Sequence, residues 1–259
     1  MNRVYHLACS LAGIATIAIS GHAMAQDNYL QIATGVDYST GDYGEVEDTK
    51  MLAAPITVKY QGEGFFLSAS TSYLRVEGPD NLVPGDGGVT PGGPVTGVST
   101  RKGMGDTIVS AGYSFGLTDS TYFDVVGKVK LPTASEAKFL GTGTTDYTVQ
   151  GELLQVFGEV SAAVRGGRRF NGSSTLFPLR DVWQAGAGVY YQTGPVTLGV
   201  DYDWREASLS TSEDRSEATA SMTYRINPAL RLQGYGYTGF ADGSPDLGGG
   251  MQLLYRFGM

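Results

Sequence analysis

The chain has 259 residues, with 26 acidic and 18 basic side chains and a formal net charge of −8. An acidic chain without a basic cluster is a poor nucleic-acid binder, and the length fits a single β domain. Its cysteine, Cys9, and both histidines, His6 and His22, lie near the start. The rest of the chain therefore lacks the residues for a disulfide, a Cys/His metal site or a Ser-His-acid triad. We expect neither an enzyme nor a bound cofactor.

The first residues predict export. Arg3 precedes an uncharged apolar run over residues 7–20, and Ala23–Ala25 has small residues where a signal peptidase cuts. The run is shorter than the roughly 20 apolar residues that a spanning helix needs. We expect residues 1–25 to be a cleaved signal peptide and residues 26–259 to form the mature domain.

Apolar and polar residues alternate along most of the mature chain. The pattern is clearest around Asp201, where Val200 and Tyr202 share one face with Val196, Leu198 and Trp204. One such face suits lipid and the other suits a polar lumen. The pattern is weakest in 146–154 and 230–238, where either register is defensible. In chain order it predicts strands at 29–38, 51–60, 65–76, 106–116, 121–131, 146–154, 159–170, 181–193, 196–205, 216–226, 230–238 and 247–257.

The connections between these strands alternate between short and long, as in outer-membrane barrels with short periplasmic turns and longer external loops. We therefore predict an all-β fold, a closed antiparallel up-and-down transmembrane β-barrel of about twelve strands. The short connections lie near 61–64, 117–119, 156–158, 194–195 and 227–229. The long ones lie near 39–49, 77–104, 132–145, 171–180, 206–215 and 239–246.

Aromatic residues near the predicted strand ends indicate interfacial girdles, because aromatic rings favour the headgroup boundary. We expect the barrel to lie in the outer membrane of a Gram-negative cell, with the lipid bilayer and lipopolysaccharide around it and the outer-membrane assembly machinery as a further partner. The aromatic residues are Tyr38, Tyr60, Phe65, Tyr73, Phe123, Tyr191, Trp204, Tyr224, Tyr255 and Phe257.

Three groups of motifs resemble a known family. Lys102–Asp106 opens a strand that ends in Tyr113–Phe115, and the next hairpin holds Gly127–Thr133 and Leu140–Asp146. The last hairpin holds Gly239–Asp246 and then Leu253–Phe257. Together these motifs resemble the outer-membrane β-barrel transporter family associated with the meta-pathway of phenol degradation, over residues 102–170 and 235–257. The resemblance implies a barrel that passes small, often aromatic, compounds.

The predicted inner face carries charges of both signs. They predict either a mixed-charge constriction that selects solutes or a paired network that fills the lumen, since an unpaired interior charge is costly. Asp201, Asp203 and Arg205 are the sharpest cluster, and Lys128 and Lys130 form a basic ladder. The candidate lumen-lining residues are Asp124, Lys128, Lys130, Glu159, Arg165, Asp201, Asp203 and Arg205; Asp37, Lys59, Asp106, Arg169, Glu217, Arg225 and Arg256 also point inward under the predicted registers.

The segment 77–104 is the longest predicted loop, with several prolines and glycines. Loops beyond roughly 15 residues are uncommon unless they are functional or disordered. This loop either folds inward to narrow the pore or stays outside it. We therefore predict a passive channel for small organic solutes, aromatic ones among them, with a closed structural or surface-binding barrel as the alternative.

Overall fold

The computed structural model describes residues 28–80, 82–85 and 97–258. The predicted signal peptide lies outside the described residues. Over the described ranges the chain forms thirteen strands and one 3-10 helix, η1. The strands are β1 (Tyr29–Gly41), β2 (Thr49–Gln61), β3 (Phe65–Pro79), β4 (Val98–Met104), β5 (Thr107–Gly116), β6 (Thr121–Leu131), β7 (Asp146–Phe157), β8 (Val160–Phe170), β9 (Val182–Thr193), β10 (Val196–Arg205), β11 (Arg215–Arg225), β12 (Leu230–Gly239) and β13 (Leu247–Gly258), and η1 is Glu136–Lys138.

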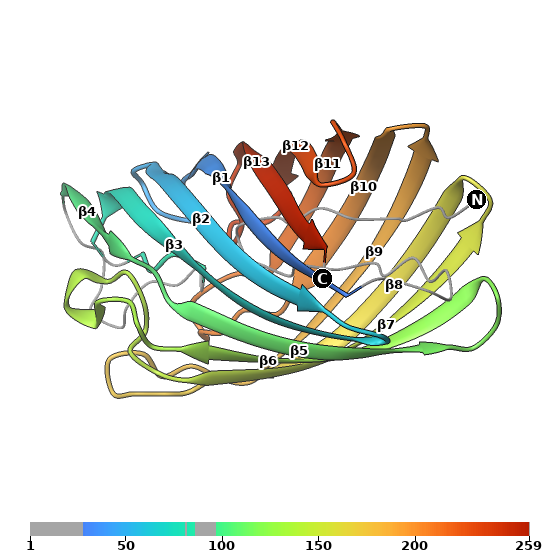
Figure 1. The fold of residues 1–259 in the computed structure, drawn as a ribbon. Coiled ribbons are helices and arrows are strands. Elements are labelled where there is room, and N and C mark those ends of the chain that lie inside the picture. The colour runs from blue at the N-terminus through green and yellow to red at the C-terminus, as the bar shows by residue number, and fades with distance from the viewer. Residues whose placement is uncertain (1–27, 81, 86–96, 259) are drawn as a thin grey trace.

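The strands form one closed antiparallel barrel, drawn in Figure 1. Neighbours in sequence pair in hairpins, and β1 pairs with β13 from Tyr29↔Gly258 to Thr40↔Leu247, which joins the blue and red ends of the ribbon. Closure through β1 and β13 gives every strand except β4 a backbone partner on both sides, as a spanning sheet requires. Among the described residues, β4 is paired with β3 alone. The predicted fold class is confirmed.

β4 and β5 share one position in the barrel wall. Both pair with β3: β4 along Tyr73–Pro79 and β5 along Phe65–Ser70. The regular strand conformation is interrupted between them at Gly105, whose N–H donates to the Ser72 carbonyl at 2.8 Å. The wall therefore has twelve strand positions, as predicted, and one of them is occupied by two strands.

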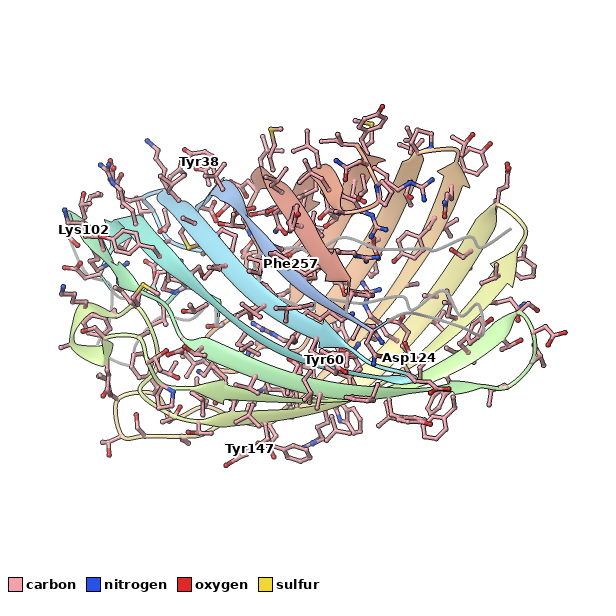
Figure 2. All side chains as sticks on the ribbon, in the orientation of Figure 1. Tyr38, Tyr60, Lys102, Asp124, Tyr147 and Phe257 are labelled. Atoms are coloured by element: carbon pink, nitrogen blue, oxygen red, sulfur yellow. The ribbon has the colours of Figure 1, made fainter. Side chains whose placement is uncertain are left out.

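The alternation predicted from sequence sets inside and outside correctly. Val36 and Tyr38 are exposed on the outer face, while Asp37 between them is buried toward the interior. Figure 2 shows Tyr38 and Tyr147 pointing away from the barrel wall. Because side chains on a strand alternate between faces, most wall strands present one apolar row outward and one largely polar row inward; β12 instead has glycines outside and Tyr235 and Tyr237 inside.

The two ends of the barrel differ. One end, the short-turn end, carries both termini of the barrel and the tight turns, including the two-residue turns at Gly158 and Gly194, where φ is 68° and 56°. Positive φ suits glycine in such hairpin turns. The other end, the long-loop end, carries the six longer connections. The predicted girdle aromatics are mostly exposed on the outer face, with Tyr60 and Trp204 half-buried.

The predicted loop over 77–104 contains more regular structure than expected. β3 continues to Pro79 and β4 begins at Val98, so the connection itself spans residues 80–97. Pro79 and Val98 are paired, which makes this part a hairpin, and β2 runs beside β3 as far as Glu77.

Candidate functional site: the barrel lumen

The lumen is lined by polar side chains that are shielded from bulk solvent. They are buried although polar because the wall encloses them, and such groups need partners. The buried charged and amide side chains include Gln31, Asp37, Lys59, Gln61, Arg101, Asp124, Asp146, Gln150, Glu152, Arg165, Asp201, Arg215, Glu217, Arg231, Gln233 and Gln252.

Arg165 is the centre of one ion-pair cluster. It extends from β8 across β9 to β10, where its Nη2 lies 2.6 Å from Oδ2 of Asp203 and its Nη1 lies 3.3 Å from Oδ1 of Asp201. The Arg165 Nε also donates to Oδ1 of Asp203 at 3.0 Å. The Tyr190 hydroxyl donates to Asp201. This fork-like pairing of guanidinium and carboxylate is strong and directional.

Glycines on β9 make the Arg165 cluster possible. A Cβ at Gly186 would lie 2.6 Å from the Arg165 Nε and 2.7 Å from Oδ1 of Asp203. A Cβ at Gly188 would lie 2.5 Å from Oδ1 of Asp201. The strand between the partners therefore presents no side chain at these two positions, so the pair forms over it.

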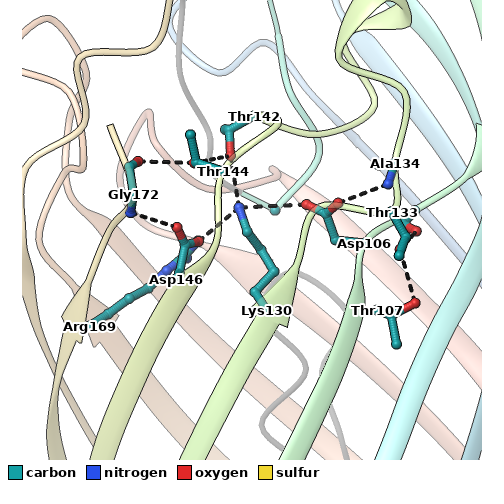
Figure 3. Close-up of polar contacts among 12 residues, drawn as sticks. Asp106, Thr107, Lys130, Thr133, Ala134, Thr142, Thr144, Asp146, Arg169 and Gly172 are labelled. Carbon is teal, nitrogen blue, oxygen red and sulfur yellow. Dashed lines mark hydrogen bonds and ion pairs between the residues drawn. The ribbon is translucent and has the colours of Figure 1, made fainter. Parts of the chain in front are cut away.

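Lys130 is the centre of a second cluster, at the long-loop end (Figure 3). Its Nζ lies 2.8 Å from Oδ2 of Asp146 and 3.5 Å from Oδ2 of Asp106, and it donates to the Thr142 hydroxyl at 2.8 Å. Arg169 Nη2 lies 2.5 Å from the same Asp146 oxygen. Because both carboxylates also accept from loop backbone N–H groups, at 2.9 and 3.0 Å, this cluster fastens the β6–β7 and β8–β9 loops to the wall.

A third cluster lies between β1 and β12. The hydroxyls of Tyr235 and Tyr237 each donate to the Asp37 carboxylate at 3.0 Å. These tyrosines point inward, where their hydroxyls hold a buried carboxylate. On neighbouring β11, Arg215 pairs with Glu217.

Gly85 of the β3–β4 connection lies across the long-loop end of the lumen from β3. The Gly85 carbonyl accepts hydrogen bonds from Arg205 Nη2 and Arg215 Nη1, both at 3.1 Å. β3 and β10 lie opposite each other in the ring of twelve positions. Gly85 therefore connects one wall to the far wall. The described residues 82–85 of the connection therefore lie inward at the long-loop end.

Apolar side chains from four loops pack beside this crossing. Val83 of the β3–β4 connection contacts Phe177, Leu179 and Leu209, and Phe139 packs against them. Phe177 is 1% exposed. We call this group the mouth cluster, and it covers part of the long-loop end.

A cavity of about 60 Å³ borders Val83 of the mouth cluster. Its lining includes Asp37, Tyr43, Leu82, Arg215 and Tyr237. Burial raises the pKa of the Tyr43 hydroxyl, in the β1–β2 loop, to about 12. This tyrosine is therefore neutral at physiological pH.

Seven of the eight candidate residues lie on wall strands with inward side chains, and two clusters collect four of them. Arg165, Asp201 and Asp203 form the first cluster and Lys130 belongs to the second, while Arg205 anchors the crossing connection. On β6, Asp124 accepts from the Ser114 hydroxyl, and Lys128 lies close enough to attract the Glu152 carboxylate. Glu159 lies apart: it is exposed in the β7–β8 turn, where Tyr191 donates to it at 3.4 Å.

Several inward groups were missed by the sequence reading. Asp146 and Glu152 lie in β7 and Arg231 lies in β12, the two strands with the weakest alternation. The sequence pattern places Arg215 in a loop, whereas in the structure it begins β11. In β7 the exposed Tyr147, Val149 and Leu153 mark the outer face, and this signal could have set the register.

Comparison with known proteins shows the fold. No protein-family model matches the sequence, and no curated protein matches it. Among solved structures, the chain is similar to the KdgM porin, with a TM-score of 0.56 and 11% identity over 87% of this chain and 99% of that one. It is also similar to the translocator domain of the autotransporter NalP from Neisseria meningitidis, with a TM-score of 0.51 and 13% identity over 90% and 89%. The chain thus has the architecture of membrane β-barrels.

Two further observations concern the described residues. They include no helix that is long and apolar enough to cross a membrane. They also include no group of three or more His, Cys, Asp or Glu side chains arranged to hold a metal ion.

Proposed function

We propose that the protein is an outer-membrane channel for the passive passage of small organic solutes. The observation that carries the proposal is a closed barrel whose outer face is apolar and whose inner face bears charges of both signs. An apolar exterior matches the hydrocarbon of a bilayer, and a polar interior matches a water-filled path. Twelve strand positions lie between small barrels filled by side chains and porins of 16–18 strands with an aqueous channel.

The candidate lumen residues are the selecting elements in this proposal. Arg165 with Asp201 and Asp203 narrows one wall, and Lys128 faces the lumen from β6. A lining of paired opposite charges favours small dipolar solutes over large apolar ones. Residues 82–85 of the β3–β4 connection act as a movable cover over the long-loop end, held there by the Gly85 hydrogen bonds and the mouth cluster.

Solute flux tests the proposal. The refolded protein is placed in vesicles whose swelling reports entry of arabinose, and of a larger sugar such as stachyose for comparison. We expect arabinose to enter faster than in protein-free vesicles and stachyose to be excluded. A variant lacking residues 81–96 should admit arabinose faster still. Absence of swelling in both forms, with the barrel shown to be folded by heat-modifiable migration, would overturn the channel function.

A closed structural or surface-binding barrel is the second candidate. The inward fold of the β3–β4 connection and the ion pairs of Arg165 favour it, because both reduce the free cross-section of the lumen. Under this alternative the external loops would bind a partner and no solute would pass. The swelling measurement separates the two functions.

Finer assignments are part of the same proposal. Residues 1–25 act as a cleaved signal peptide, and the assembly machinery inserts the barrel. Lipopolysaccharide in the outer leaflet of the membrane contacts the outer face of the barrel. The motif resemblance supports aromatic compounds, of the kind met in phenol degradation, as solutes. We also propose that the protein is not an enzyme, since it has no histidine after His22 and histidine is the commonest general base.

A further inference from the structure

Four basic side chains lie near one another at the short-turn end: Lys59 and Arg231 are buried, Arg256 is half-buried and Arg225 is exposed. Arg225 of β11 and Arg231 of β12 are directly opposite in register. Arg256 of β13 and Lys59 of β2 both pair in register with Gln31 of β1, one on each side. Like charges directly opposite on neighbouring strands are destabilising. Such an arrangement is unfavourable unless an anion neutralises part of the positive charge.

Two of the four have protein partners. Arg256 donates from Nε to Gln31 at 2.9 Å and lies 4.2 Å from the Tyr29 ring centroid. Lys59 lies 4.8 Å from the centroid of the Phe66 ring. Gln31, Tyr29 and Phe66 are neutral groups, and Asp124 attracts Lys59 from a distance.

Arg231 has no such compensation. It is 6% exposed, and its Nη1 is buried without a hydrogen-bond partner. Within the described ranges it forms no ion pair, and Arg225 and Arg256 repel its guanidinium. Arg165, buried to a similar degree, binds two carboxylates. Burial of an unpaired charge is expensive unless something else neutralises it.

A cavity adjoins this guanidinium. It has a volume of about 20 Å³ and is formed where the β9–β10 turn meets β11 and β12. Its volume exceeds the roughly 10–15 Å³ needed for one water-sized group. The amide oxygen of Gln192, which also borders it, is likewise buried without a partner. The lining residues are Gln192, Gly194, Pro195, Thr197, Thr223, Arg225 and Arg231.

We propose that this cavity binds the carboxylate of small organic anions, with Arg231 and Arg225 as the direct ligands. Arginine suits this role, because its planar N–H donors match the two oxygens of a carboxylate. The hydroxyls of Thr197 and Thr223 border the same space, and Lys59 and Arg256 add long-range attraction. The cavity is only slightly larger than one water-sized group, so the carboxylate oxygens enter it and the rest of the solute stays outside.

The site specifies a solute class for the proposed channel and depends on that function only for how the solute arrives. In the channel, this basic site would hold organic acids at the opening of the short-turn end. Binding itself requires no transport. The two claims can therefore fail separately.

Calorimetric titration of the full protein in detergent micelles tests the site, with benzoate as the probe and benzyl alcohol as its neutral analogue. We expect benzoate to bind and benzyl alcohol to bind at least tenfold more weakly. Arg231→Gln should weaken benzoate binding about tenfold or more, because it removes the charged donor. Arg231→Lys should fall between the two.

Arg75→Gln is the matched control, since it removes an exposed arginine whose contact with Glu77 lies at the surface. This control should bind benzoate within twofold of the unmodified protein. Each variant is first shown to be folded by heat-modifiable migration. Equal benzoate affinity in Arg231→Gln and the unmodified protein, or equal binding of benzoate and benzyl alcohol, would overturn the site. Benzoate binding without solute flux would overturn the channel and leave the site intact.

Discussion

Arg165 and Asp203 form a two-point ion pair across an intervening strand. Nε and Nη2 of Arg165 lie 3.0 and 2.6 Å from Oδ1 and Oδ2 of Asp203, and β9 passes between the two residues. Gly186 leaves the space through which the guanidinium extends. Three wall strands are thereby linked by side chains as well as by backbone hydrogen bonds.

Replacement of Arg165 by methionine should destabilise the barrel by about 3–5 kcal/mol, the range for removing one member of a buried pair. We expect the low end of this range, because the Asp203 side chain is 39% exposed. The loss arises because Asp201 and Asp203 then face each other without a cation. Urea unfolding in lipid vesicles measures it.

A triple variant is the control for this prediction. Arg165→Met combined with Asp201→Asn and Asp203→Asn removes the charges together and should recover most of the lost stability. If the single and triple variants are equally unstable, shape rather than charge is the cause.

Arg205 and Arg215 should control how often the mouth is covered. A hydrogen bond from a charged donor is worth about 1.5–3 kcal/mol. The double variant Arg205→Ala/Arg215→Ala should therefore raise the open fraction of single-channel traces at least about tenfold. Arg75→Ala serves as a control for loss of charge outside the lumen. An unchanged open fraction in the double variant would show that the Gly85 contacts do not govern the cover.

Phe177→Ala should loosen the loops without unfolding the wall. Truncation of a buried phenylalanine costs about 3–5 kcal/mol, and here the loss falls on the mouth cluster alone. Limited proteolysis should cut the long-loop end faster, while heat-modifiable migration stays unchanged. Leu176→Ala, beside it and 41% exposed, should leave proteolysis as it was. Protection equal to that of the unmodified protein would contradict the packing described above.

Charge on the outer face should be costly in proportion to its depth in the bilayer. Val200 is 61% exposed near the middle of β10, and Val200→Arg should cost about 2–4 kcal/mol in vesicles. Val160→Arg, at the turn end of β8, should cost about 0–1 kcal/mol. Unfolding titrations compare the two variants. Equal costs would contradict a lipid-facing exterior centred on Val200.

The strands could be predicted because the wall imposes a simple pattern. In 196–205 every second residue is apolar, and the structure faces Val200 and Tyr202 outward with Asp201 inward. In β12 the inward rows hold Tyr235 and Tyr237 while glycines lie outside, so hydropathy alone assigns the wrong face as easily as the right one. The inward face of β12 is marked by Asp37, which accepts a hydrogen bond from each tyrosine and lies about 200 residues away in sequence.

The candidate site was harder to predict than the wall. Arg165, Asp201 and Asp203 were each expected to face inward, but their pairing depends on the registers of three strands and on the missing side chain at Gly186. Arg231 was missed because its strand has weak alternation. The inward path of the β3–β4 connection depends on contacts with distant loops, which no local pattern encodes.

Single-channel conductance in planar bilayers, with and without residues 81–96, tests the account most directly. The deletion joins Asp80 to Gly97 between the paired Pro79 and Val98, and Asp-Gly is a favoured two-residue hairpin turn. The wall should therefore fold as before. We predict brief openings in the unmodified protein and steady conductance after the deletion. Silence in both forms, with both shown to be folded, would contradict an open path through the barrel.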